Sequence, residues 1–340
     1  MDILEKGKLS DGRNYEVIRI VTPAQEIPED LIRYFIASFG FDYYRKYVQD
    51  QTYWRLYYRE SFAGTLAPEV VDHHYVIRVE GVYAGRIWFG YNTRTGHGNF
   101  GNVFTEPDFR RLGIMGILMK HCMEGFRSSS AIQLCCGSGS KFAVQFYLKH
   151  GFKLIYGGDT GPLCLRKNGS FQEAACSAFP GHERCTVRHG SIGDQFECDK
   201  FLYYTPAWQN FPQQSFGLAA AVTDYRIAFQ EKLSGCGAVN VLTTPSGAVC
   251  AYAFALKYFG ADILEFRFHP EYPEHLPELI RQTAADYEKM FDAVPVCAAA
   301  EDAEIKLGAL HRAGFREDGG LNAVFRLFRP EKNELTEIKG

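Results

Sequence analysis

The sequence predicts an α+β protein with two domains, each a mixed, mostly antiparallel twisted sheet flanked by helices. Its length of 340 residues is more than twice that of a typical domain of about 150 residues. Strand and helix patterns alternate along the chain, and the same succession restarts after residue 182. Hydrophobic residues make up 46% of the chain and include 27 Phe and 20 Tyr, enough to fill two cores. This composition excludes wholesale disorder.

The elements of the first half follow the order β-αα-βββ-α-β-α-ββ. Alternation with a period of two indicates the strands, and apolar residues three and four apart indicate the helices. Glu80-Gly81 is typical of a tight hairpin turn, and Ser140 is typical of a helix N-cap. We expect strands at 15–21, 74–79, 82–89, 99–105, 131–136, 152–156 and 162–165, and helices over 28–61, 112–126 and 140–150.

The second half repeats features of the first at a constant shift of 163 residues. At this shift Glu106-Pro-Asp-Phe109 superposes on His269-Pro-Glu-Tyr272, and Gly151-Phe152 superposes on Gly314-Phe315. Several matches at one shift, with the same order of strands and helices, indicate the duplication of one fold. We therefore predict a first domain over residues 1–168, a linker over 169–182 and a second domain over 183–340.

The charge of the chain limits its partners. The 37 Lys and Arg against 40 Asp and Glu give −3, too small a charge to gather nucleic acid or an anionic membrane non-specifically. Residues 1–168 carry +4 and residues 169–340 carry −7, which favours the first half for an anionic ligand. The N-terminus lacks the apolar core of a signal peptide, and no run of about 18 apolar residues could span a bilayer. We expect a cytoplasmic protein without nucleic-acid or membrane partners.

Neither the ten cysteines nor the ten histidines show the spacing of a metal site. Cys176, Cys185 and Cys198 lack the C-x2-C spacing of a zinc site, and no H-E-x-x-H motif is present. We therefore expect reduced, mostly buried thiols and no metal.

The most informative segment is 103–119, where a strand ends at Pro107, a basic turn follows, and Gly113 and Gly116 open an apolar helix. Backbone N–H groups at a helix N-terminus lack intrahelical partners and carry roughly half a positive charge. Glycines there let an anion approach the backbone, and Arg110 and Arg111 add charge. The segment matches neither a Walker P-loop nor a G-x-G-x-x-G dinucleotide fingerprint. It predicts a pyrophosphate site of another kind.

Two motifs in this half resemble those of the GNAT superfamily, the acyl-CoA-dependent N-acyltransferases. The R/Q-x-x-G-x-G/A signature lies on Arg110-Arg-Leu-Gly-Ile-Met115, and the A-x-x-x-Y-x-x-x-G-F pattern lies on Ala143 to Phe152. The match departs at Met115, where the family usually has Gly or Ala, and Gly116 follows immediately. The resemblance covers about residues 14–167 and implies acetyl-CoA as the co-substrate.

The resemblance also implies roles for individual residues. The strand Val103-Phe-Thr105 would splay from its neighbour, and its backbone amides would bind the pantetheine arm and polarise the thioester carbonyl. Tyr147 would protonate the leaving thiolate, the alternative being that it is one more core aromatic. The cofactor-binding residues implied are Val103, Phe104, Thr105, Arg110, Arg111, Leu112, Gly113, Ile114, Met115 and Gly116.

The second half resembles a degenerate copy of the same fold, so that the whole chain resembles a tandem GNAT protein. Tyr147 corresponds to Leu310, which cannot donate a proton, and Met115 corresponds to Glu278, a carboxylate where an anion would bind. Arg110, Gly113 and Gly116 correspond to Pro273, Leu276 and Leu279. We expect the second domain to be structural or to bind something different.

The general base stays unassigned among five candidates. A carboxylate or histidine would help to deprotonate an ammonium group. Glu106 and Asp108 flank Pro107, and His97 is expected in a surface loop. His73 and His74 should point to opposite sides of one strand, so that only one could face a site.

The acceptor is expected to be an amine, small or peptidic. Twelve Phe, Tyr or Trp residues lie between Tyr34 and Phe62, more than two helices need for their core faces, which suggests a cavity for an apolar or cationic acceptor. The same rings could instead cover a neighbouring domain or seal a homodimer. A protein N-terminus or lysine as acceptor would favour an open acidic groove. The competing class is a non-catalytic acyl-CoA-binding or protein-interaction module.

Overall fold

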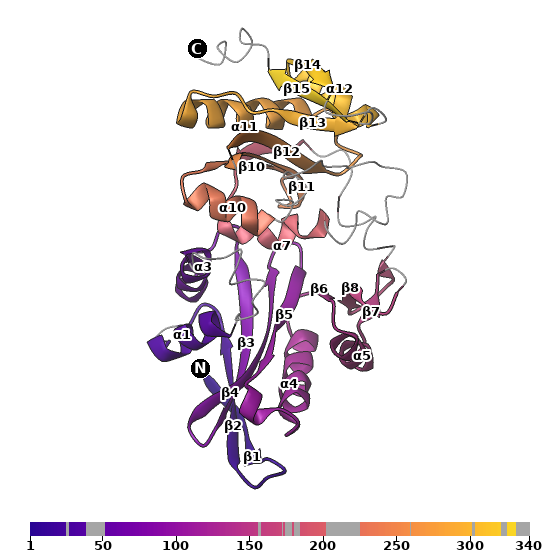
Figure 1. Cartoon of the computed structure of the whole chain (residues 1–340). Helices are drawn as coiled ribbons and strands as arrows, with labels where there is room; N and C mark the ends of the chain where they lie inside the picture. Colours follow the sequence, from indigo (N-terminus) through magenta and orange to yellow (C-terminus); the bar gives the residue numbers. More distant parts are fainter. Residues whose placement is uncertain are drawn as a thin grey trace. The chain divides into compact units, whose positions relative to one another are not determined.

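In the computed structural model the chain divides into two compact units, Met1–Phe171 and Gln172–Gly340, each described here by itself (Figure 1). The structure describes residues 1–24, 27–38, 52–155, 158–171, 173, 179, 184–201, 225–258, 260–300, 303–320 and 325–330. Most of the predicted linker 169–182 lies outside these residues. Both units are mixed, mostly antiparallel sheets with helices, so the predicted fold class is confirmed.

Unit 1 is built on an eight-stranded sheet of order β1-β2-β3-β4-β5-β6-β8-β7. Its only parallel pair among the described strands is β5 with β6. The strands are β1 Asp2–Lys8, β2 Asn14–Val21, β3 Val70–Val79, β4 Val82–Asn92, β5 His97–Thr105, β6 Gln133–Ser138, β7 Lys153–Leu154 and β8 Gly161–Arg166. The helices are α1 Glu29–Ala37, α3 Thr52–Ala63, the 3-10 turn η1 Pro107–Phe109, α4 Ile114–Ser128 and α5 Lys141–Lys149.

Strand β1 was not expected from the sequence. Its side chains are mostly exposed or half-buried, so it lacks the apolar alternation that marks a half-buried strand. Backbone pairing with β2 from Asp2 to Lys8 holds it at the sheet edge. The other expected strands, the Glu80-Gly81 hairpin and the Ser140 N-cap, whose side chain accepts from the Ala143 N–H, are confirmed.

The helices of unit 1 cover both faces of the sheet (Figure 1). On one face α4 packs its apolar stripe against β3, β4 and β5, and Phe126 meets Phe89 edge-on at 6.2 Å between ring centroids. On the other face α1 and α3 pack against β3, where His74 stacks on Phe35 at 4.8 Å. The alternation of neighbouring β3 residues between the two faces places His73 on the α4 side, stacked on Phe89.

Unit 2 contains a sheet of order β12-β11-β10-β9 and a sheet of order β13-β15-β14. A parallel bridge between Ile263 and Val296 links β12 to the segment that leads into β13. The strands are β9 Thr186–His189, β10 Gly237–Thr243, β11 Val249–Tyr258, β12 Ala261–Phe268, β13 Cys297–Ala300, β14 Phe315–Gly320 and β15 Phe325–Pro330. The helices are η2 Ile192–Asp194, α7 Gln195–Cys198, α10 Tyr225–Leu233, α11 Leu276–Phe291 and α12 Glu304–Arg312.

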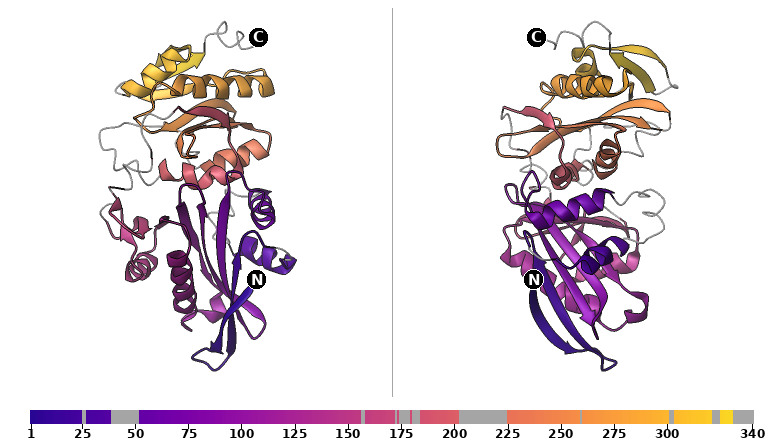
Figure 2. Two further views of the ribbon diagram at one scale, coloured as in Figure 1. Left: turned by 180° about the vertical axis from the view of Figure 1, so that it is seen from behind. Right: turned by 90° about the vertical axis from the view of Figure 1, so that its left-hand side faces the viewer.

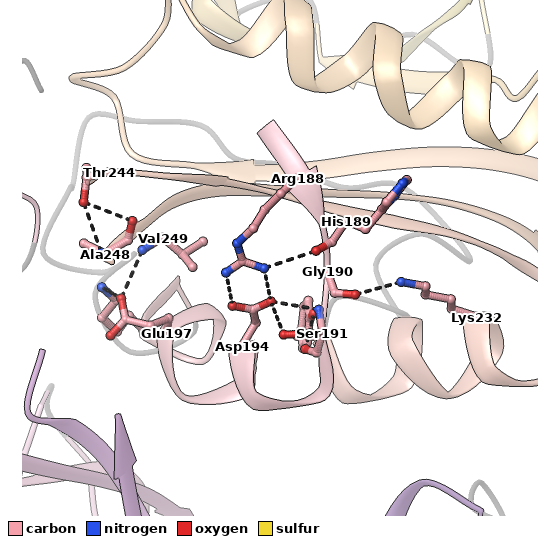
Figure 3. A network of polar contacts seen from close by, with 12 residues as sticks. Arg188, His189, Gly190, Ser191, Asp194, Glu197, Lys232, Thr244, Ala248 and Val249 are labelled. Carbon is pink, nitrogen blue, oxygen red and sulfur yellow. Dashed lines mark hydrogen bonds and ion pairs between the residues drawn. The ribbon is translucent and has the colours of Figure 1, made fainter. Parts of the chain in front are cut away.

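The helices of unit 2 also lie on both faces of the first sheet, with α11 on one face and α7 and α10 on the other (Figure 2). A polar network ties the second set to the strands (Figure 3). Arg188 of β9 donates two hydrogen bonds to Asp194 at 2.8 and 2.6 Å, and Asp194 also accepts from the Ser191 N–H. Glu197 of α7 accepts from the Val249 N–H of β11 at 3.1 Å. These bonds give partners to two buried carboxylates. Burying either carboxylate without a partner would destabilise the fold.

No helix among the described residues is both long and apolar enough to cross a membrane.

The packing of α4 on the sheet gives a prediction for two glycines of that helix. A Cβ on Gly125 would lie 1.7 Å from the hydroxyl of buried Tyr75, whereas a Cβ on Gly116 would meet nothing within 4 Å. Gly125→Ala should therefore lower the free energy of unfolding by about 1–3 kcal/mol through overpacking. Gly116→Ala, the matched control, should raise it by about 0.5–1 kcal/mol because alanine favours helix. Urea unfolding of both variants tests this, and an unchanged Gly125→Ala midpoint would contradict the close approach.

Candidate active site

The parallel strands β5 and β6 pair over only three residues. His97–Asn99 lie opposite Gln133–Cys135, and beyond them β5 keeps its β4 partner while no further β6 pairing occurs. The strands then separate, as the resemblance implied. Because the strands are parallel, α4 and α5 both begin at the open end of this gap (Figure 1). The gap thus lies at the carboxyl ends of two strands, where open sheets bind ligands.

A bulge in β5 lies beside the gap. Arg86 is opposite Phe104 and Trp88 is opposite Gly101, so Asn102 and Val103 together face the single residue Ile87. Asn102 has a left-handed backbone with φ of 53°. A bulge leaves backbone groups of the extra residue outside the ladder. No sequence motif marks Asn102, although the Gly-Asn pair inside a strand is a weak bulge signal.

The turn between β5 and α4 presents backbone to open space. Gly113 is the N-cap of α4 with φ of 82°, and no side chain caps this helix end. A Cβ on Gly113 or Gly116 would meet nothing within 4 Å, so protein packing does not explain either glycine. The first N–H groups of α4 therefore face a space that an anion could occupy.

The side chains of this turn divide into two groups. Ile114 is buried, and Leu112 and Met115 are partly buried against the same core, so these three offer the site their backbone only. Met115 consequently packs away from the space in front of the glycines. Arg110 and Arg111 are exposed, with the Arg110 Nε donating to the Thr105 carbonyl at 3.2 Å. Both arginines therefore lie exposed to solvent in the turn that links β5 to α4.

Tyr147 lies between the two separating strands. The centroid of its ring lies 5.4 Å from that of Phe100 in β5 and 5.8 Å from that of Phe152. Cys136 of β6 is close enough to influence the pKa of the Tyr147 hydroxyl. Burial, with Cys136 as a second cause, raises the pKa of Tyr147 well above its usual range, so the phenol is protonated at neutral pH. Tyr147 is thus a core aromatic whose protonated phenol lies near both separating strands.

The candidate bases do not converge on this gap. His97 is the first residue of β5 and only 6% exposed, so the expectation of a surface loop was wrong; the strand begins two residues earlier than predicted. Burial lowers the pKa of His73 to about 4 and holds that of His74 well below its usual range. The two rings stack on opposite faces of the sheet, as expected for neighbouring residues of a strand. Asp108 is exposed, and Glu106 lines a shallow pocket with Tyr34 and Tyr83.

The aromatic residues predicted to line an acceptor cavity are only partly described. Phe39, Phe41, Tyr43, Tyr44 and Tyr47 lie outside the described residues. Those of α3 pack mostly on one another and on the sheet, with Tyr53, Tyr57, Tyr58 and Phe62 buried. An open groove does run between α1 and α3, lined by apolar side chains and by Glu29, Arg55 and Arg59.

Asp72 of β3 is a buried carboxylate that the sequence analysis missed. It is fully buried and accepts hydrogen bonds from Tyr57 at 2.8 Å, from the Trp88 indole at 2.7 Å and from Ser61. Burial raises the pKa of Asp72 to about 6, against the lowering effect of these donors. No sequence signal distinguishes this aspartate, because its partners are 11 to 16 residues away along the chain.

Comparison with known families identifies the fold of this site. Residues 29–152 match the model of the acetyltransferase (GNAT) family. Unit 1 carries a GNAT acetyltransferase domain. This match supports an acyltransferase enzyme, and the GNAT resemblance of the first half is confirmed. The match does not reach unit 2, so the degenerate second GNAT copy stays a prediction.

Solved structures similar to the GNAT domain include three with low identity. They are PH1933 from Pyrococcus horikoshii OT3 (17% identity, TM-score 0.32), an acyl-CoA N-acyltransferase from Pseudomonas aeruginosa (12%, 0.33) and the paia N-acetyltransferase from Thermoplasma acidophilum in complex with coenzyme A (10%, 0.29). Each comparison covers 44% of this chain and 99% of the other. A search of curated proteins finds no match. Within the described part of the GNAT domain and of unit 2, no three His, Cys, Asp or Glu side chains gather as metal ligands.

The raised pKa of Asp72 predicts a pH-dependent contribution to stability. Because the folded pKa is about 6 and the ordinary value is 3.8, the contribution is complete below pH 4 and is lost as pH rises through 6. The loss amounts to about 3 kcal/mol. The free energy of unfolding of the wild type, minus that of Asp72→Asn, should therefore fall by this amount between pH 4 and pH 7.

Urea unfolding at a series of pH values measures this difference. The subtraction removes contributions to the free energy of unfolding that do not involve Asp72. A difference that does not change with pH would mean that Asp72 ionises in the folded chain as it does in water.

Proposed function

We propose that the first unit transfers an acetyl group, or a similar short acyl group, from acetyl-CoA to a primary amine within a ternary complex. The observation that carries the proposal is the pair of glycines, Gly113 and Gly116, that face open space at an uncapped helix N-terminus beside the gap between β5 and β6. Glycine inside a helix destabilises it relative to alanine, and a ligand that approaches the backbone accounts for this cost.

The proposed donor site follows the two edges of this gap. The first N–H groups of α4, together with Arg110 and Arg111, would bind the pyrophosphate, each charge-assisted bond contributing about 1.5–3 kcal/mol. The backbone of Val103, Phe104 and Thr105 lacks a β6 partner and would pair with the amide-bearing pantetheine arm. The side chains of Phe104, Leu112, Ile114 and Met115 pack elsewhere, so these residues would contribute backbone groups.

The proposed reaction is direct attack of the amine. The nitrogen lone pair forms a bond to the thioester carbonyl carbon, and bulge amides near Asn102 stabilise the negative charge on the carbonyl oxygen. The C–S bond then breaks, and Tyr147 gives its phenolic proton to the departing thiolate sulfur. The proton lost by the amine passes to solvent or to a base that is still unassigned. Holding both reactants in the gap lowers the entropic part of the barrier.

The acceptor is proposed to be an amine of apolar or cationic character that meets the α1 and α3 side of the sheet. The described rings of these helices pack mostly on one another, and the open groove between α1 and α3 carries apolar side chains together with Glu29, Arg55 and Arg59. Its identity follows from a screen of amines once donor binding is established.

The second unit is proposed to be a degenerate copy that does not bind acyl-CoA. Its elements follow the order of unit 1 from β2 onward, and α12 spans Glu304–Arg312, the range of α5 shifted by 163 residues. At the positions of Asn102 and Ala143, unit 2 has Glu265 and Lys306. Their side chains form a fully buried ion pair of 2.6 Å between β12 and α12, where the donor would otherwise lie. This pair, with Leu310 in place of Tyr147, supports a structural role for residues 183–340.

Calorimetric titration of the full chain with acetyl-CoA tests the donor site. We expect one equivalent to bind, because only unit 1 is proposed to bind it. Gly116→Asp, which places a carboxylate in the open space at an ordinary helical position, should abolish binding, and Gly116→Ala should weaken it less. Two equivalents, or unchanged binding by Gly116→Asp, would contradict the proposed site, and binding without turnover of any amine would favour an acyl-CoA-binding module.

Tyr147→Phe tests the proposed acid. The phenyl ring preserves the contacts with Phe100 and Phe152, so acetyl-CoA affinity and stability should be close to those of the wild type. The kcat for amine acetylation should fall by about 10²-fold or more, the usual contribution of a positioned acid. An unchanged kcat would assign Tyr147 to packing alone.

A further inference from the structure

The closed end of the gap between β5 and β6 has a different wall on each face of the sheet. On the α5 face, Phe100 packs with Tyr147 and Phe152. On the α1 and α3 face, the cross-strand partner of Gly101 is Trp88, a residue that is 8% exposed. The first wall is a packed core, and the second includes the Trp88 side chain.

Gly101 gives the indole its access to the gap. A Cβ on Gly101 would lie 3.9 Å from the Cε3 and Cζ3 atoms of Trp88, an ordinary contact, so packing alone would accept alanine. Gly98, three residues earlier, differs, because its Cβ would lie 2.2 Å from the Gly90 carbonyl oxygen. Glycine within a strand is unfavourable and often marks the close approach of a ligand.

Asp72 fixes the orientation of this indole. Its carboxylate accepts from Trp88 Nε1 at 2.7 Å and is held in turn by Tyr57 and Ser61 of α3. The Asp72 N–H donates to the Thr22 hydroxyl at 2.8 Å. Residues of β3 and α3 therefore hold the indole of Trp88, whose ring edge lies near Gly101.

The direction of the proposed donor places its acyl group at this point. A donor with its pyrophosphate at Gly113 and its carbonyl at the bulge near Asn102 points its acyl chain toward Gly101 and the closed end. Paired strands lie about 4.8 Å apart, too close for a methylene chain between them, and pairing resumes at Asn99. A chain longer than acetyl must leave the plane of the sheet, and Trp88 stands where it would leave.

We propose that Trp88, held in place by Asp72, limits the acyl group that the site accepts to a short chain. This proposal rests on the proposed function, since it concerns the same donor site. Trp88 would touch the acyl group directly, whereas Asp72 is a positioning residue that acts through the indole.

The test is calorimetric titration of the full chain with CoA, acetyl-CoA, butyryl-CoA and hexanoyl-CoA, which needs no knowledge of the acceptor. In the wild type, hexanoyl-CoA should bind at least tenfold more weakly than acetyl-CoA, in line with the 10–200-fold effect of one methylene in a tight pocket. Trp88→Leu should reduce this ratio at least tenfold. Asp72→Ala, which frees the indole, should change the ratio in the same direction.

Two further variants keep the test decisive if Trp88→Leu folds poorly. Gly101→Ala narrows the same space from the other strand and should weaken acetyl-CoA binding at least fivefold relative to free CoA. Phe89→Leu is the matched control, since it shortens an aromatic on the same strand but on the α4 face, and it should leave the ratio between donors unchanged.

The outcomes separate the two proposals. If neither CoA nor acetyl-CoA binds to the wild type, the donor site itself is wrong. If both bind but Trp88→Leu and Gly101→Ala leave the chain-length ratios as they were, or Phe89→Leu shifts them equally, the role of Trp88 is overturned and the donor site stands.

Discussion

The parallel pairing of β5 with β6, and its end after three residues, is the constraint on which the site of unit 1 depends. Two strands that stay paired would leave no free backbone edge and no space between them. Once they part, β5 has an unpaired edge, and the helices that follow each strand begin on either side of the opening. The bulge at Asn102 lies in the part of β5 that has left β6. The extra strand twist caused by the bulge and the unpaired amides of β5 therefore occur at the same place.

The site is made chiefly of backbone, which explains its composition. The residues around the turn direct their larger side chains into the core, and the positions that face the opening are glycines or arginines. An anion at the proposed site would then be met by N–H groups whose positions are fixed by a helix, at no cost in side-chain entropy. Specificity beyond the anion must come from the few side chains at the closed end.

The sequence carried enough information for most of the fold, because helix stripes and strand alternation are local patterns. It did not carry the edge strand β1, which is held by backbone pairing and shows no apolar alternation. Motifs in the sequence singled out the Gly113 turn and Tyr147. The prediction of an exposed His97 was wrong, because β5 begins at His97 and the burial of its imidazole depends on where the strand starts. Asp72 and Asn102 escaped notice for a related reason, since a buried hydrogen-bond cluster and a bulge depend on residues from several elements.

The ion pair between Glu265 and Lys306 has a consequence for how sequences of this kind can change. Removing either partner leaves the other charge buried without a counter-ion. This typically destabilises a protein by about 3–5 kcal/mol, a large share of the stability of one domain. A lineage that holds this pair can leave it only by substituting both residues nearly together. Once such a pair is acquired, single substitutions do not easily reverse it, because each one destabilises the domain.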